Sequence, residues 1–136
     1  MNAILSLAFL CLASAGPGRT LWNSSMGADG VLRLDSSKER AFEWARYAMT
    51  PRETVLKPNM RYEITFRARV EGLAPDSYLY AIIRPESTGG AEKDAGDLPV
   101  HPTDGAWQDC RMRFTTGPEP DYRLQFHSHN RIKAEV

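Results

Sequence analysis

The sequence predicts an all-β fold, an antiparallel two-sheet β-sandwich, and three observations carry this prediction. Roughly seven short apolar segments are separated by turns rich in Gly, Pro, Asn and Asp. Two of these segments, residues 61–70 and 107–115, alternate apolar and polar side chains as a strand with one wet face does. No segment of convincing length carries the periodicity of a helix. Short strands at this spacing are typical of sandwiches and barrels.

The first fifteen residues predict an export signal. Residues 2–15 contain no charged side chain, and their apolar run falls short of the roughly 20 residues that a membrane span needs. Ala13-Ser14-Ala15 supplies the small residues of a signal-peptidase site. No Lys or Arg precedes the run, and a buried N-terminal strand or helix is the alternative. We therefore expect a signal peptide at 1–15, a single domain at 16–136, and a secreted, periplasmic or cell-surface location.

The net charge indicates which partners are unfavoured, and the cysteine content indicates whether disulfides can stabilise the fold. Lys plus Arg and Asp plus Glu both number 17, so the chain is neutral, which argues against nucleic acid or an anionic membrane as the main partner. No second apolar stretch is expected to span a membrane. Cleavage of the signal would remove Cys11 and leave Cys110 alone, so the fold would be held by its core without a disulfide.

The strands of the N-terminal half follow from turn signals and side-chain pattern. A short strand at 31–34 begins after the turn Asp29-Gly30. The aromatic residues of 41–49 favour a strand, although its Ala, Glu and Arg also permit a helix. The turn at 57–59 precedes the alternating strand 61–70. Segment 78–84 is apolar on both sides and predicts a strand covered on both faces.

The C-terminal half is expected to contain a long loop and three further strands. Residues 85–106 are rich in Gly, Asp, Glu and Pro, and loops of this length are usually functional or disordered. Strand 107–115 follows, with Trp107 expected in the core. Strand 122–127 is expected to turn its even-numbered residues inward and Arg123, Gln125 and His127 outward, and residues 132–136 form the last strand.

This order of segments resembles the CenC-type carbohydrate-binding modules. The segment 55–70, VLKPNMRYEITFRARV, is similar to the family's strand pattern L-x-P-[GN]-x-x-Y-x-[IL]-[ST]-F-x-[AV]-[RK]. A later family strand resembles 104–116, and 122–126 follows it as in the family. The resemblance covers residues 20–136 and implies a jelly-roll sandwich with a galactose-binding-domain-like fold that binds sugar without chemistry. Residues 132–136, IKAEV, replace the acidic pair of the family's last strand, which weakens a structural calcium site; no other cofactor is implied.

Sugar recognition requires aromatic faces for the C–H surface of a pyranose and planar polar groups for its hydroxyls. Core packing is the competing role for each aromatic residue, and a solvated sheet face is the competing role for each polar one. Tyr78 and Tyr80 share one face of their strand. The candidate carbohydrate-binding residues are Trp44, Tyr78, Tyr80, Arg84, Gln125 and His127.

Other chemistry has little support in the sequence. His127 and His129 have the spacing of two metal ligands on one strand, but no third ligand follows at a fixed spacing, and we predict no metal site. The acidic residues of the loop lack the order of a calcium-binding loop. No catalytic motif occurs, and Cys110 is expected to be a buried small hydrophobe. We predict no catalytic residue and no enzyme activity.

The sequence thus predicts an exported carbohydrate-binding-module-like domain whose partner is a glycan or polysaccharide. A separate glycoside hydrolase or cell-surface protein is a second expected partner, and nucleic acid and membrane are not. The alternative is a structural or protein-interaction β-sandwich without a glycan site, in which Arg67, Arg69, Arg111 and Arg113 pack on another protein. Aromatic rings exposed together on one face favour the first interpretation, and burial of every Trp ring favours the second.

Overall fold

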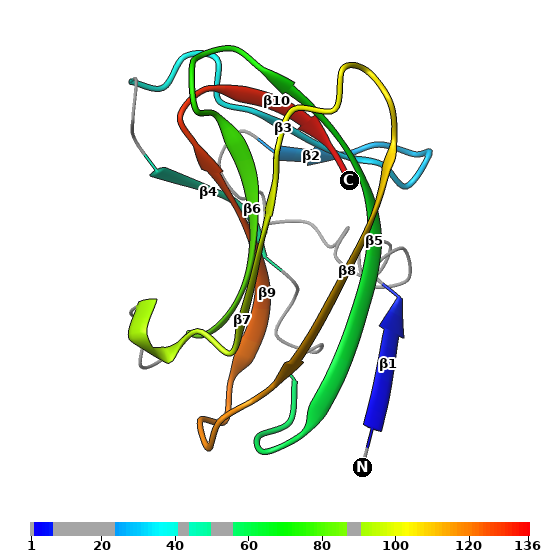
Figure 1. The fold of residues 1–136 in the computed structure, drawn as a ribbon, viewed down its shortest axis with the longest axis vertical. Coiled ribbons are helices and arrows are strands. Elements are labelled where there is room, and N and C mark those ends of the chain that lie inside the picture. Colours follow the sequence, from blue (N-terminus) through cyan, green and yellow to red (C-terminus); the bar gives the residue numbers. More distant parts are fainter. Residues whose placement is uncertain (1, 7–23, 41–43, 50–55, 87–90) are drawn as a thin grey trace.

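The computed structural model describes residues 2–6, 24–40, 44–49, 56–86 and 91–136, and these residues form two β-sheets that pack face to face (Figure 1). The observed class is therefore the predicted one, an all-β sandwich. Every strand pairing is antiparallel except that between β1 and β5. Among the described residues there is no helix with the length and apolar character that a membrane span requires.

One sheet contains β1, β2, β3, β5, β8 and β10, and the other has the order β4-β9-β6-β7. The strands of the first sheet are β1 (Asn2–Ser6), β2 (Ser24–Met26), β3 (Leu32–Asp35), β5 (Arg61–Gly72), β8 (Gln108–Thr115) and β10 (Ile132–Glu135). Those of the second are β4 (Trp44–Met49), β6 (Tyr78–Pro85), β7 (Gly96–Val100) and β9 (Tyr122–His129).

The long strand β5 organises the first sheet. Its first eight residues, from Arg61 to Ala68, pair with β8, and its last four, from Arg69 to Gly72, pair with β10. β1 lies parallel to β5 opposite residues 61–65, so part of the predicted signal peptide is a strand in the full chain. The predicted cleavage site lies outside the described residues, and the signal peptide stays a prediction.

The core lies between the sheets and is built by alternation along the strands. Tyr62, Ile64, Phe66, Ala68 and Val70 of β5 are buried, as the sequence predicted, while the residues between them face outward. The strand β8 repeats the pattern. An edge-to-face contact between the rings of Phe66 and Phe126, with centroids 5.5 Å apart, joins β5 to β9 across the core.

The prediction of one long loop over 85–106 is wrong for its centre, where β7 pairs with β6 along the edge of the sheet. Gly96 and Pro99 weaken the sequence signal of a strand, but an edge strand tolerates proline because one side of it lacks a partner. Glycine is required at 96, since a Cβ there would lie 2.9 Å from the Cβ of Phe114. This close approach brings β7 against β8 of the other sheet.

Two further predictions need correction. Arg123 and Gln125 lie on the outer side of β9 but are buried, where Arg123 is bonded to Glu86 and Gln125 to His127. Trp107 is half-buried just before β8 and is absent from the core cluster. The predicted strand 41–49 is observed from Trp44 onward, and its first three residues lie outside the described part of the chain.

Candidate functional site

The outer face of the four-stranded sheet carries a row of aromatic rings that crosses the strands. Trp44 of β4 and Tyr78 of β6 are both in register with His129 of β9, which stands between them. The His129 ring centroid lies 4.5 Å from that of Trp44 and 4.8 Å from that of Tyr78. His101, just beyond β7, extends the row, with its ring 5.5 Å from Tyr78. Strand register therefore assembles three of these rings from three strands, and the segment after β7 adds the fourth.

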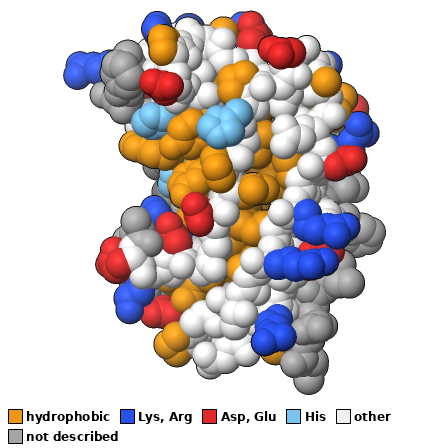
Figure 2. Space-filling view, in the orientation of Figure 1, with side chains coloured by type: hydrophobic (Ala, Val, Ile, Leu, Met, Phe, Trp, Pro, Cys, Tyr) orange, Lys and Arg blue, Asp and Glu red, His pale blue; other side chains and the backbone are white. Residues whose placement is uncertain are grey.

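These rings form a faceted cluster, because neighbouring rings are tilted against one another. Trp44 meets Tyr78 edge-on at 81°, and Tyr78 meets Tyr80 at 83°. Trp44 is 51% exposed, the one large hydrophobic residue among the described side chains with this degree of exposure. Figure 2 shows hydrophobic and histidine side chains gathered on this side of the molecule, with acidic side chains directly below them. We call Trp44, Tyr78, Tyr80, His101 and His129 the aromatic face.

Tyr80 begins the polar part of this surface. Its hydroxyl donates a hydrogen bond to Asp97 of β7, and this bond, together with burial, raises the pKa of Tyr80 to about 12. The phenol therefore stays protonated at neutral pH, and its orientation is fixed by the carboxylate. The exposed Asp97 keeps acceptor capacity beyond this bond, so a hydroxyl-bearing ligand placed against Tyr80 would meet a carboxylate oxygen.

His127 and Gln125 of β9 form a second polar group on this surface. His127 is opposite Tyr80, and its Nε2 makes a 3.0 Å hydrogen bond with the side-chain oxygen of Gln125. Gln125 is only 2% exposed, so a buried amide fixes the orientation of the His127 ring. The Nδ1 atom of His129 is buried and has no hydrogen-bond partner among the described residues. The face therefore presents imidazole groups beside its aromatic rings.

Two arginines lie on the same face where β6 ends and β9 begins, and each is paired with a carboxylate. Arg84 donates to both oxygens of Asp94, at 2.6 and 2.9 Å, and this bidentate pair raises the pKa of Arg84. Arg123, in register with Arg84, donates to Glu86. These paired charges leave the end of the face polar without strong net charge.

All six predicted carbohydrate-binding residues thus lie on one face of one sheet. Trp44, Tyr78, Tyr80 and His127 are at least partly accessible there, while Arg84 is half-buried in its ion pair and Gln125 is buried. The structure adds His129, His101 and Asp97 to this group. From the sequence, His129 is a candidate only as a metal ligand, and His101 and Asp97 fall in the predicted loop 85–106 because β7 has a weak strand signal.

Three acidic residues of the predicted loop are already bound to side-chain donors. Glu86 accepts from Arg123, Asp94 from Arg84 and Asp97 from Tyr80. Within the described ranges no group of three His, Cys, Asp or Glu residues has the arrangement of a metal site. These acids therefore serve the architecture of the second sheet.

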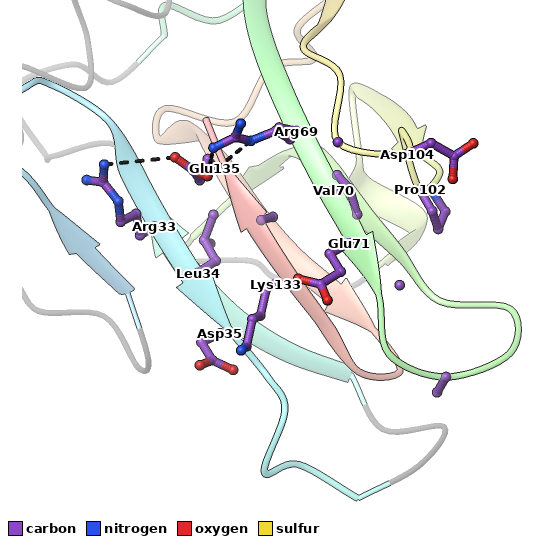
Figure 3. Close-up of a pocket in the computed structure, with 14 residues that line it drawn as sticks. Arg33, Leu34, Asp35, Arg69, Val70, Glu71, Pro102, Asp104, Lys133 and Glu135 are labelled. Atoms are coloured by element: carbon purple, nitrogen blue, oxygen red, sulfur yellow. Dashed lines mark hydrogen bonds and ion pairs between the residues drawn. The ribbon is translucent and has the colours of Figure 1, made fainter.

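A cavity of about 1060 Å³ lies on the other sheet, over β3, β10 and β5 (Figure 3). Its floor consists of two rows of alternating charge, Arg33–Glu135–Arg69 and Asp35–Lys133–Glu71. Glu135 pairs with the arginine on each side of it. A loop segment from Pro102 to Gly105 forms one wall. Opposite charges face one another across the strands, and the six charges of the floor sum to zero, so the floor offers no net charge to a ligand.

Neither a protein-family model nor a curated protein matches this chain. The site must therefore be interpreted from its own geometry.

Proposed function

We propose that this protein is an exported, non-catalytic glycan-binding module and that it binds its ligand on the aromatic face. The observation that carries the proposal is the exposure of Trp44 beside Tyr78 and Tyr80, with hydrogen-bonding groups within the same surface. Sugar rings present C–H groups to aromatic faces and hydroxyls to polar side chains, and this surface supplies both kinds of partner.

The arrangement favours binding over chemistry. Arg84 and Arg123 are bonded to Asp94 and Glu86. Asp97 accepts a hydrogen bond from the Tyr80 hydroxyl. Each of these carboxylates thus holds a side-chain donor in place, and the exposed Asp97 keeps acceptor capacity for a ligand hydroxyl. The resemblance to CenC-type carbohydrate-binding modules, whose ligands are glycans, points in the same direction. A polysaccharide outside the cell is the proposed partner, and a separate hydrolase would act on it.

Affinity electrophoresis of the full chain tests the proposal. The chain is run through gels that contain neutral soluble polysaccharides, with and without calcium, alongside Trp44→Ala and Trp107→Ala variants. Both variants lose an indole, but Trp107 lies on the other sheet, so it is a matched control. We expect one polysaccharide to retard the chain, and Trp44→Ala to weaken that binding about tenfold, equivalent to ~1.4 kcal/mol.

Two results would overturn the proposal. One is unchanged mobility of the folded chain in every gel. The other is equal loss of retardation in both variants, because a ligand that depends on both sheets equally does not bind at the aromatic face. Thermal unfolding of each variant confirms that the fold persists, and Trp44 is suited to this because its exposure keeps the structural cost of truncation small.

A further inference from the structure

The outer face of the first sheet carries a line of exposed arginines on β5 and β8. On β8, Arg113 and Arg111 are in register with Glu63 and Thr65 of β5. The line then passes to β5, where Arg67 faces Asp109 and Arg69 follows two residues later. We call Arg113, Arg111, Arg67 and Arg69 the arginine stripe. Figure 2 shows basic side chains over β8, on the side of the molecule away from the aromatic face.

The guanidinium groups of the stripe are largely in solvent. The side chains of Arg67, Arg111 and Arg113 are 64%, 62% and 72% exposed. One carboxylate, Glu63, serves both Arg111 and Arg113, and only 19% of its side chain is exposed. The bond from Arg113 holds the pKa of Glu63 below its usual value, so this carboxylate stays ionised. Two cations therefore share one anion that lies beneath them.

Trp107 supports the other end of the stripe. The guanidinium of Arg67 lies 5.6 Å and that of Arg69 5.2 Å from the centre of the indole ring. Cation–π contacts of this kind orient an arginine without neutralising it. Arg69 is also bonded to Glu135, whereas the partner of Arg67 is Asp109, whose side chain is 92% exposed. The indole thus holds both cations on the surface.

The spacing of the stripe is regular. Residues two apart on a strand are about 6.8 Å apart, so the four arginines extend over roughly 20 Å with one cation at each step. Arg61 adds a further cation at the start of β5. Among the described residues, the carboxylates that pair with these five arginines are Glu63, Asp109 and Glu135, so this part of the face has more cations than anions although the whole chain is neutral.

We propose that the arginine stripe binds an anionic polysaccharide, one that carries sulfate or carboxylate groups along a linear chain. Arginine matches both groups with two parallel hydrogen bonds. The face also presents the hydroxyls of Thr65 and Thr115. Among the side chains that the structure describes on β5, on β8 and just before β8, the large apolar group of this face is Trp107, and it lies beneath two guanidiniums. A stable protein interface is centred on desolvated apolar anchors, and these described side chains supply none. A hydrated polyanion suits it better than an acidic protein does.

This inference does not rest on the function proposed for the aromatic face. The two surfaces belong to different sheets, and the core lies between them. A chain that fails to bind neutral polysaccharide could still bind a polyanion, and the reverse is equally testable. If both proposals hold, one molecule bridges a neutral and an anionic glycan.

Dextran sulfate and dextran provide matched probes, because they share a backbone and differ in charge. Binding of each to the full chain is measured by isothermal titration calorimetry at about 0.02 M and about 0.5 M salt, since the added salt screens exposed charges. The test variant is Arg111→Gln/Arg113→Gln. The control variant, Lys38→Gln/Lys93→Gln, removes the same charge from two exposed lysines outside the stripe. Polyglutamate serves as the protein-like polyanion.

We expect dextran sulfate to bind at low salt and dextran not to bind through this face. The arginine variant should weaken dextran sulfate binding about tenfold, and the lysine control should change it less than about twofold. Equal loss in both variants would show that net charge alone controls binding and would overturn the proposal. Absence of binding at low salt, or tighter binding of polyglutamate than of dextran sulfate, would overturn it as well. Unchanged melting temperatures verify that both variants are folded.

Discussion

The contact between Phe66 and Phe126 allows a quantitative test of the sandwich itself. The two rings are 3–6% exposed, come from opposite sheets, and meet edge-to-face at 79°. Phe126→Ala should lower the free energy of unfolding by about 3–5 kcal/mol, because it removes a buried ring and leaves a cavity. Since urea lowers stability by about 1–3 kcal/mol per molar, the unfolding midpoint should fall by about 2 M.

A double-mutant cycle with Phe66→Ala isolates the contact between the two rings. An aromatic pair contributes about 0.5–1.5 kcal/mol beyond its buried area, so the double variant should lose less stability than the sum of the single variants. Urea unfolding followed by tryptophan fluorescence measures all four proteins. Phe114→Ala, another buried ring on the first sheet, is a control that should be additive with Phe126→Ala. Full additivity of the 66 and 126 substitutions would refute the proposed packing of the sheets.

Two further predictions concern titratable groups. Burial raises the pKa of the Cys110 thiol to about 11, so little reactive thiolate is present at neutral pH. In a Cys11→Ser chain, a disulfide reagent should therefore label Cys110 slowly in the folded state and quickly in urea. Fast labelling of the folded chain would contradict the burial of Cys110. The pKa of Tyr80 is about 12 in the folded protein rather than 10, so the folded state holds the phenol proton more tightly than the unfolded state does. This proton therefore stabilises the fold fully below about pH 10, and the stabilisation is lost as the pH rises from about 10 to 12. Absorbance titration at alkaline pH should show a late phenol in the wild type that Asp97→Asn moves earlier and Tyr80→Phe removes.

The sequence was most informative where one face of a strand is wet. Along β5 and β8 the alternation of apolar and charged side chains determines which residues are buried, and these assignments are confirmed. Along β9 the same rule failed, because Arg123 and Gln125 lie on the outer side of the strand and are nevertheless buried. Gln125 is bonded to His127, and Arg123 to Glu86, 37 positions away; a contact between residues as far apart in sequence as Arg123 and Glu86 is not visible in the local pattern of one strand.

The candidate site shows the same division. Tyr78 and Tyr80 share a face by the two-residue period of one strand, which the sequence makes plain. That Trp44 and His129 join them follows from the pairing of β4 with β9 and of β9 with β6, so it required the structure. Trp107 was expected in the core because tryptophans usually are, but two arginines from β5 cover its ring and hold it at the surface.

The position of β9 explains how one small domain can hold a rigid aromatic face. The inward side chains of β9 belong to the core, and its outward Gln125 and Arg123 are buried and bonded. His129 is therefore held by its own strand while the rings of Trp44 and Tyr78 pack on either side of it. If the aromatic face binds a ligand as proposed, His129 would lose little conformational entropy on binding, since its ring is already packed between two others. The partly exposed Trp44, on an edge strand, is the member of the face with the most freedom to adjust to a ligand.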